Sequence, residues 1–257
     1  MPLIHTEAVV LRRRRMRDSD AIITLFAKEC GKIAVSAKSV MKTTSRSAGV
    51  TQSFNRLHAI LYAKNRDQDI WTLTQVSLVE SYNNLQTDLN RMAFASCLAE
   101  WVDFLSHDFE SSLAVWDLIM QAFTRWNQSE PNKEELIYYQ WRLLRYAGLH
   151  PNLSGAAEGI THIYNAADGR LIESGSSAEH GVVMHAGSLM ALKNLASAKE
   201  PPSLRLSQQQ QTEIQRLIHS HLEFHVGRRS RSSLFLDRLL REELKPNAPP
   251  TMETNAL

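Results

Sequence analysis

Apolar positions at the start of the chain, up to about residue 80, follow the two-residue period of β-strands. The odd-numbered residues from Leu57 to Ala63 show it best, because they form an apolar face opposite a mixed one. Turn-forming residues separate such segments, as at 18–20 and 29–32. The predicted strands are residues 6–14, 21–27, 32–37, 52–63 and 70–80. Five short strands in about 80 residues predict a small barrel such as an OB-fold.

Between the third and fourth predicted strands lies a long polar segment, residues 38–51. It combines Ser, Thr and Gly with the cations Lys38, Lys42 and Arg46. This composition is typical of an exposed connection between strands. We therefore expect a long, mobile, basic loop on the barrel.

From Leu85 onward the apolar spacing becomes that of amphipathic helices. The inward residues of the first predicted helix are Leu85, Leu89, Met92, Phe94, Leu98, Ala99, Trp101, Val102 and Leu105. Those of the second, residues 112–126, are Leu113, Trp116, Ile119, Ala122, Phe123 and Trp126. A third helix is predicted over residues 133–147, where Asn132 caps it, Glu135 completes a capping box and Gly148 ends it.

The rest of the chain is less regular. Residues 160–164 and 171–173 flank turn residues 165–169 and predict a hairpin, and residues 187–196 predict a short helix. Ser207 and Gln210 form a capping box for a helix that Gly227 ends. Its inner face is predicted as Ile214, Leu217, Ile218, His221, Leu222 and His225. Residues 232–244 predict a last amphipathic helix, and the proline-containing tail 246–257 is predicted to be disordered.

The composition is that of a folded, soluble protein: 43% of the 257 residues are apolar and 22% are charged. We expect no membrane association, because no apolar run reaches the roughly 18 residues of a spanning helix and the first residues lack a secretory pattern. The chain has only two cysteines, Cys30 and Cys97, which favours a reducing, cytoplasmic setting. We expect both to be small buried apolar residues.

Positive charge is concentrated at the front of the chain. Residues 1–80 hold 13 Lys and Arg against 7 Asp and Glu, a net charge of +6, whereas residues 81–257 hold 16 against 20, a net charge of −4. A basic module joined to a mildly acidic one favours a polyanionic partner for the first module. An ordinary surface that is merely basic is the alternative interpretation.

No motif of a known catalytic site occurs. The sequence lacks phosphate-binding glycine loops, a nucleophile elbow, a metalloprotease helix and a calcium loop. The carboxylate pairs Glu134–Glu135 and Glu242–Glu243 are expected on solvated helix surfaces. We therefore predict no catalytic residues and no cofactor.

Histidines do not form a metal site by their spacing. His221 and His225 are four residues apart and share a helix face, as zinc ligands would, but the sequence fixes no third ligand. We predict no metal.

The arginine run Arg12–Arg15 is the most distinctive local feature. Side chains alternate along a strand, so one pair of these arginines should face solvent. Planar guanidinium groups suit phosphates, and OB-folds bind single strands in basic grooves with stacking aromatics. The aromatic candidates are Phe26, Phe54, Tyr62 and Trp71. The predicted DNA contacts are Arg12, Arg13, Arg14, Arg15, Arg17, Lys32, Lys38, Lys42, Arg46, Arg228, Arg229 and Arg231.

The N-terminal pattern, EAVVLR at 7–12 followed by DSDAIITLFAKECGKIAVSAK at 18–38, resembles the RecO family of bacterial recombination mediators. WTLTQV at 71–76, LLRYAGL at 143–149 and HVGRRSRS at 225–232 resemble later family segments. The resemblance is densest in the first 80 residues and patchy from about 140 to 240.

The resemblance implies an α+β, multi-domain chain: an N-terminal OB-fold barrel (1–80), then a mainly helical domain (81–150 and 203–245). Many family members carry two C-x-x-C pairs after the helix that ends near Gly148. This chain has none there, so residues 151–202 are expected to be a degenerate, metal-free remnant of a zinc-finger-like insertion.

The resemblance also implies a function in DNA repair without catalysis. It implies binding of single- and double-stranded DNA, annealing of complementary strands, and loading of RecA onto DNA coated by single-stranded-DNA-binding protein, together with RecR. The acidic tail of that binding protein needs an apolar pocket beside a cation. We place it at Arg125, Arg142 or Arg145, beside Trp101, Phe123 or Tyr139.

Two other functions stay open at this stage. A basic barrel could serve an adaptor that binds RNA or protein, and a hydrolase could use a site assembled only in three dimensions.

Overall fold

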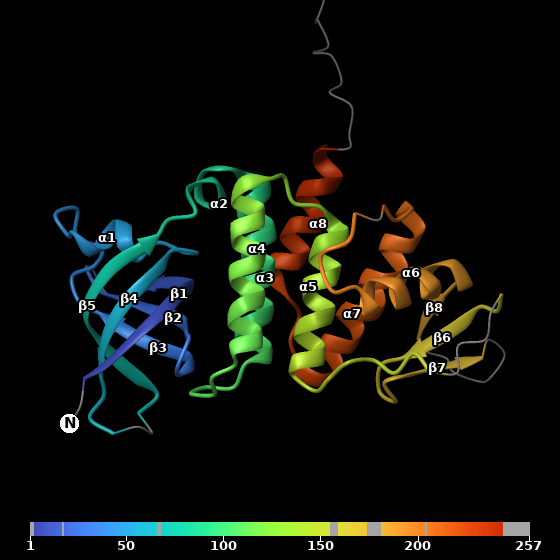
Figure 1. Cartoon of the computed structure of the whole chain (residues 1–257), viewed down its shortest axis with the longest axis horizontal. Helices are drawn as coiled ribbons and strands as arrows, with labels where there is room; N and C mark the ends of the chain where they lie inside the picture. Colours follow the sequence, from blue (N-terminus) through green and yellow to red (C-terminus); the bar gives the residue numbers. More distant parts are fainter. Residues whose placement is uncertain are drawn as a thin grey trace, which may run out of the picture.

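The computed structural model of the protein describes residues 3–16, 18–65, 68–154, 159–173, 181–203 and 205–243. A five-stranded barrel lies at one end, antiparallel helices form the middle, and a small sheet with its own helix lies at the other end (Figure 1). The barrel and the helical domain expected from the sequence are both confirmed.

The barrel contains β1 (Ile4–Arg15), β2 (Ala21–Ala27), β3 (Gly31–Ala37), β4 (Arg56–Tyr62) and β5 (Ile70–Glu80). It closes in the order β1-β2-β3-β5-β4, with β3 and β5 parallel and the other pairs antiparallel. Leu57, Ala59 and Leu61 point into its core, as the alternation predicts. Only β4 starts well away from its predicted position, because residues 47–54 form the short helix α1 (Ser47–Val50) and a turn in which Phe54 has a φ of 75°.

The helical body consists of α2 (Asn83–Thr87), α3 (Leu89–Leu105), α4 (Leu113–Gln128), α5 (Lys133–Tyr146), α7 (Gln208–Val226) and α8 (Arg231–Glu243). The first predicted helix is divided, because Asp88 is extended and its side chain accepts a hydrogen bond from the Arg91 N–H, which starts α3. Leu89, Met92 and Leu113 were expected in the core but are exposed. They lie in first turns, and burial begins at Ala93 and Val115.

The carboxylates of Glu134 and Glu135 are buried, so the expectation of a solvated pair is wrong. Asn132 caps α5 by accepting from the Glu135 N–H, but the Glu135 side chain does not complete the predicted capping box. It accepts instead from Arg125 Nε and Trp126 Nε1, both at 2.7 Å. Glu134 accepts from the Leu206 N–H and from Gln211 Nε2, so the pair joins α5 to its neighbours.

The small sheet has the order β7-β6-β8, formed by β6 (His162–Asn165), β7 (Arg170–Glu173) and β8 (Val182–Met184). The predicted hairpin at residues 160–173 and the helix α6 (Ala186–Ser197) are confirmed. The capping box of Ser207 and Gln210 also forms, and Gly227 ends α7 in the left-handed conformation. His225 is exposed, contrary to its predicted inward position, because the buried face of α7 ends at Leu222. The tail 246–257 lies outside the described residues.

The turn between β2 and β3 meets the loop between α3 and α4. Gly31 has a φ of +71°, and a Cβ atom there would lie 1.9 Å from the Glu110 carbonyl oxygen. The Phe109 N–H donates to the Lys32 carbonyl oxygen at 3.0 Å, and the Phe109 ring stacks on Trp71 with centroids 5.3 Å apart. The barrel is therefore seated on the helical body by close backbone contact.

We predict that Gly31→Ala lowers the free energy of unfolding by about 2 kcal/mol or more, because the methyl group meets backbone that cannot move aside and the φ is unfavourable for alanine. Urea unfolding followed by circular dichroism measures this. Gly49→Ala is the matched control, since nothing lies within 4 Å of its Cβ position. Equal urea midpoints for the two variants would contradict a close backbone contact between Gly31 and Glu110.

Candidate nucleic-acid interface

A bulge in β1 decides where its arginines point. The register with β2 changes from Val10 opposite Leu25 to Arg12 opposite Thr24, which leaves Leu11 as the extra residue. Leu11 is buried, and beyond it Arg12 and Arg14 are exposed on one face of the strand. The alternation expected from the sequence therefore leaves both side chains largely exposed, although Arg12 also lies 3.3 Å from Asp103 Oδ2.

Arg13 and Arg15 have partners within the protein. The Arg13 guanidinium donates to the Ala48 carbonyl oxygen at 2.8 Å and to Thr51 Oγ1 at 3.2 Å. Burial lowers the pKa of Arg13 from its ordinary value. Arg15 donates to the Asp18 carbonyl oxygen at 2.7 Å. These two arginines fasten α1 and the β1–β2 turn, and Arg17 lies outside the described residues.

The basic loop after β3 carries exposed cations. Lys38, Lys42 and Arg46 all face solvent. The loop is tied to the β1–β2 turn, because the Ser39 N–H donates to Asp20 Oδ1 at 2.8 Å and the Met41 N–H donates to the Ser19 carbonyl oxygen. Lys38 follows Ala37, which pairs with Ala21, and Ala21 pairs with Arg15. The loop therefore begins at the same end of the barrel as the arginines.

Lys32, a predicted DNA contact, is used inside the protein. Its Nζ donates to the Asp103 carbonyl oxygen at 2.8 Å and lies 3.2 Å from Asp108 Oδ1 and 3.6 Å from Asp103 Oδ1. The side chain is only 17% exposed. Because these contacts occupy the ammonium group, Lys32 joins the barrel to α3, and we leave it out of the interface.

One arginine of the second predicted cluster, in the turn between α7 and α8, contacts a side chain of α3. Arg228 lies over the ring of Phe104 at 5.9 Å from its centroid. Phe104 lines a cleft of about 210 Å³ together with Arg12, Ser53 and Ser232. Arg12 therefore lines this cleft directly, and Arg228 is connected to it through Phe104.

The other arginines of this turn are exposed but differ in their partners. Arg229 pairs with Glu223 at 2.7 Å. The backbone N–H of Arg231 donates to Glu100, which leaves its side chain facing solvent. Of the three, Arg228 and Arg231 are thus the better phosphate ligands, because an ion pair already competes for Arg229.

Sequence reasoning missed Phe104 and Asp103, which line the cleft from α3. Both read as ordinary helix positions. The sequence indicates this site only through the three-residue spacing of Glu100 and Asp103, which places both carboxylates on one helix face.

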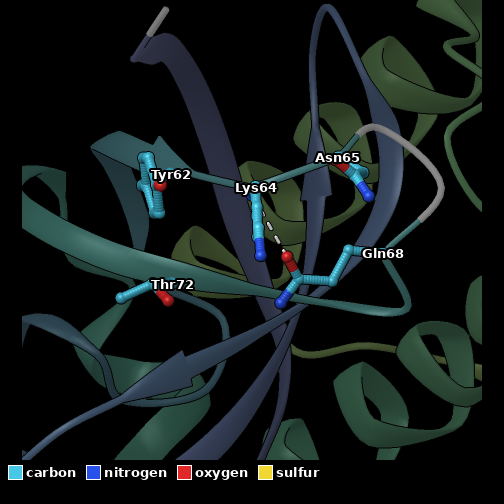
Figure 2. Close-up of a pocket in the computed structure, with 5 residues that line it drawn as sticks. All are labelled: Tyr62, Lys64, Asn65, Gln68 and Thr72. Atoms are coloured by element: carbon cyan, nitrogen blue, oxygen red, sulfur yellow. Dashed lines mark hydrogen bonds between the residues drawn. The ribbon is translucent and has the colours of Figure 1, made fainter. Parts of the chain in front are cut away.

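Of the four aromatic candidates on the barrel, only Tyr62 is exposed; Phe26, Phe54 and Trp71 are core. Tyr62 borders a cavity of about 520 Å³ with Lys64, Asn65, Gln68 and Thr72. Figure 2 shows these side chains around the opening, with the Lys64 N–H bonded to Gln68 Oε1 at 3.1 Å. The preceding Leu61 pairs with Ile4, so this cavity lies at the opposite end of β1 from the arginines.

Comparison with known proteins agrees with this architecture. The family model described as "Recombination protein O N terminal" matches residues 1–82, and "Recombination protein O C terminal" matches residues 86–234. The chain belongs to the RecO family. It is 28% identical over 252 residues to the DNA repair protein RecO of Symbiobacterium thermophilum, covering 93% of this chain and 98% of the relative.

Two further relatives carry the same name. The DNA repair protein RecO of Desulforamulus reducens is 25% identical over 256 residues, covering 95% of this chain and 98% of the relative. The DNA repair protein RecO of Heliobacterium modesticaldum is 35% identical over 156 residues, covering 60% of this chain and 55% of the relative. The resemblance read from the sequence is confirmed, and membership of this family supports a role in DNA repair.

The aromatics expected beside the arginines that would hold a partner's acidic tail are closed to a ligand in this RecO-family chain. Trp101, Phe123 and Tyr139 are buried in the helical core. Arg125 pairs with Glu135, while Arg142 donates to the Ala198 and Lys199 carbonyl oxygens; Arg145 is exposed. A cation next to an open apolar pocket must therefore be sought elsewhere.

A cavity with a mixed polar and apolar lining lies next to α5, α7 and α8. It has a volume of about 820 Å³, with Phe94 and Leu240 as apolar lining and Lys133, Arg216 and Arg241 as cations. Asp237 is the acidic group in the same lining.

His221 is used as a neutral hydrogen-bonding residue. Its Nδ1 lies 2.5 Å from the Tyr164 hydroxyl, and its Nε2 bonds to the Leu149 carbonyl oxygen. Since the Leu149 oxygen can only accept, Nε2 carries the proton and Nδ1 accepts from Tyr164. Burial lowers the pKa of His221 to about 4. With both nitrogens bonded, His221 cannot ligate zinc in this conformation.

Within the part of the chain that the structure describes, no cluster of three or more metal-ligating side chains occurs, and no helix has the length and apolarity needed to cross a bilayer.

We predict that stability falls as the pH drops from about 6.5 to 4. The folded pKa of His221 lies below its unfolded value, so the unfolded chain binds the proton first and the stabilising contribution is lost in that window. The loss attributable to His221 is about 2–3 kcal/mol. Urea midpoints of wild type and His221→Gln across this range measure it. Parallel pH profiles for the two proteins would show that His221 is not responsible.

Proposed function

We propose that this RecO-family protein is a non-catalytic recombination mediator that binds single- and double-stranded DNA through a basic path across two domains. The observation that carries the proposal is the cleft on α3, which Arg12 lines and whose lining residue Phe104 lies under the Arg228 guanidinium. The proposed path includes the exposed cations Lys38, Lys42, Arg46, Arg14, Arg12, Arg228 and Arg231.

Binding by this path would depend on phosphates and not on base sequence. Each phosphate neutralised by an arginine or lysine releases condensed counterions, which favours binding at low salt. The barrel aromatics contribute little, because only Tyr62 is exposed. Cations that reduce the repulsion between two backbones would also favour annealing of complementary strands.

We predict that Arg12→Glu combined with Arg14→Glu weakens binding of single-stranded DNA at least about tenfold, and that the slope of log Kobs against log salt becomes shallower by about two units. Fluorescence anisotropy of a labelled oligothymidine over a salt series measures both quantities. Arg13 is kept, because its bonds to α1 are structural.

Arg170→Glu is the control for a charge reversal at a distant site, since Arg170 is exposed on β7, at the other end of the molecule (Figure 1). If both proteins kept the wild-type slope, the barrel arginines would not contact DNA. The α7–α8 turn alone would then be the next candidate.

We infer the remaining partners from the family: the acidic tail of single-stranded-DNA-binding protein, RecR, and RecA indirectly. The cavity between α5, α7 and α8 fits such a tail, because an apolar side chain can enter beside Phe94 and Leu240 while carboxylates meet Lys133, Arg216 and Arg241. This location replaces the one expected at Arg125, Arg142 and Arg145.

We predict that Arg216→Glu with Arg241→Glu weakens binding of an acidic, phenylalanine-ended peptide at least about tenfold, because charge reversal replaces attraction by repulsion. Isothermal titration calorimetry with the full chain measures the affinity. Arg145→Glu is the control for a charge reversal outside the cavity, because Arg145 is exposed and does not line it. A larger loss in the control would place the tail on the outer face of α5.

A further inference from the structure

We propose that the cleft between β1 and α3 is a binding site for one phosphodiester group, and that the Asp103 carboxylate holds Arg12 there until a phosphate displaces it. The proposal rests on the proposed DNA binding and adds a regulated contact to it. The cleft holds about 210 Å³, and Arg12, Ser53, Ser96 and Ser232 line it. A guanidinium group with neighbouring hydroxyls is a suitable donor set for phosphate oxygens.

Arg12 is held only loosely by the protein. Its Nη2 lies 3.3 Å from Asp103 Oδ2, and 63% of its side chain remains exposed. Such a single, solvated ion pair contributes little to stability. A phosphate that offers two oxygens to the same guanidinium competes with it well.

Asp103 does not lose its neutralising charge when Arg12 leaves. Lys32 lies 3.6 Å from its other carboxylate oxygen and also donates to its carbonyl oxygen at 2.8 Å. Lys32 is held in place by Asp108 as well, at 3.2 Å. The released carboxylate therefore still has Lys32 as its partner. Transfer of Arg12 from Asp103 to a phosphate leaves no isolated charge between the barrel and α3.

The second carboxylate on this face of α3 is not free to compete. Glu100 accepts from Ser230 Oγ at 2.6 Å and from the backbone N–H groups of Ser232 and Arg231 at 2.9 and 3.3 Å. It therefore neutralises the N-terminus of α8, where the helix dipole favours an anion. Asp103 is thus the carboxylate in the cleft whose partner can be exchanged for DNA.

The test compares four variants of the full chain with wild type: Asp103→Asn, Asp108→Asn, Arg12→Gln and the double variant Arg12→Gln/Asp103→Asn. Anisotropy of a labelled oligothymidine at several salt concentrations gives the affinities and the slopes. Asp108→Asn is the matched control, because it removes a carboxylate that pairs with Lys32 and is not paired with Arg12 in the structure.

We expect Asp103→Asn to bind about two- to fivefold more tightly than wild type at low salt, the range of an exposed ion pair, with a slope steeper by up to about one unit. For Asp108→Asn we expect less than half of this increase in affinity. In the Arg12→Gln background the Asp103 substitution should bring no gain, because the pair it breaks is already absent.

Equal gains for Asp103→Asn and Asp108→Asn, or a full gain in the Arg12→Gln background, would overturn the proposal in favour of a general charge effect. If Asp103→Asn loses stability, the affinity of Asp103→Ser replaces it in the comparison, because the serine variant removes the same negative charge. An Arg12→Gln variant with wild-type affinity would instead contradict the proposed barrel interface itself. Weaker binding in Arg12→Gln without tighter binding in either Asp103 variant would contradict only the exchange.

Discussion

The position of the barrel on the helical body depends on the contacts around Lys32. Its backbone carbonyl oxygen accepts from Phe109, and its ammonium group reaches Asp103 and Asp108. Gly31, immediately before it, permits the backbone of Glu110 to approach closer than any side chain would allow. These contacts hold the barrel against α3, next to the cleft that Arg12 and Asp103 line.

Within this fold, cations are divided into those that stabilise the protein and those that remain for a ligand. Arg56 shows the first kind: it bonds to Glu7 and lies 3.6 Å from Glu80, and the Glu7 bond raises the pKa of its guanidinium. Arg14 and Lys42 are cations that remain for a ligand, because both are exposed on the barrel surface. Arg12 lies between the two, with a partner that a phosphate can replace. The net charge of +2 conceals this division.

At the far end of the molecule, apolar packing and the hydrogen bonds of His221 connect the small sheet to the helices. Tyr164 and Met184 of the small sheet are fully buried in the same core as the helices. The Tyr164 hydroxyl and the Leu149 carbonyl oxygen meet His221 of α7. The small sheet is thus attached to α7 by apolar packing and by the hydrogen bond of Tyr164 to His221.

Local signals in the sequence were sufficient for most of the secondary structure and for the family. Strand periodicity and the Ser207 capping box act over a few residues, so their outcome does not depend on distant parts of the chain. Tertiary structure decided which charged groups remain available. Lys32 is bonded to a residue 71 positions away, Glu135 is buried against α4, and Arg228 lies over Phe104, which lines the cleft of Arg12. The partner of a charged side chain depends on which surfaces meet in the folded chain, and no local pattern contains that information.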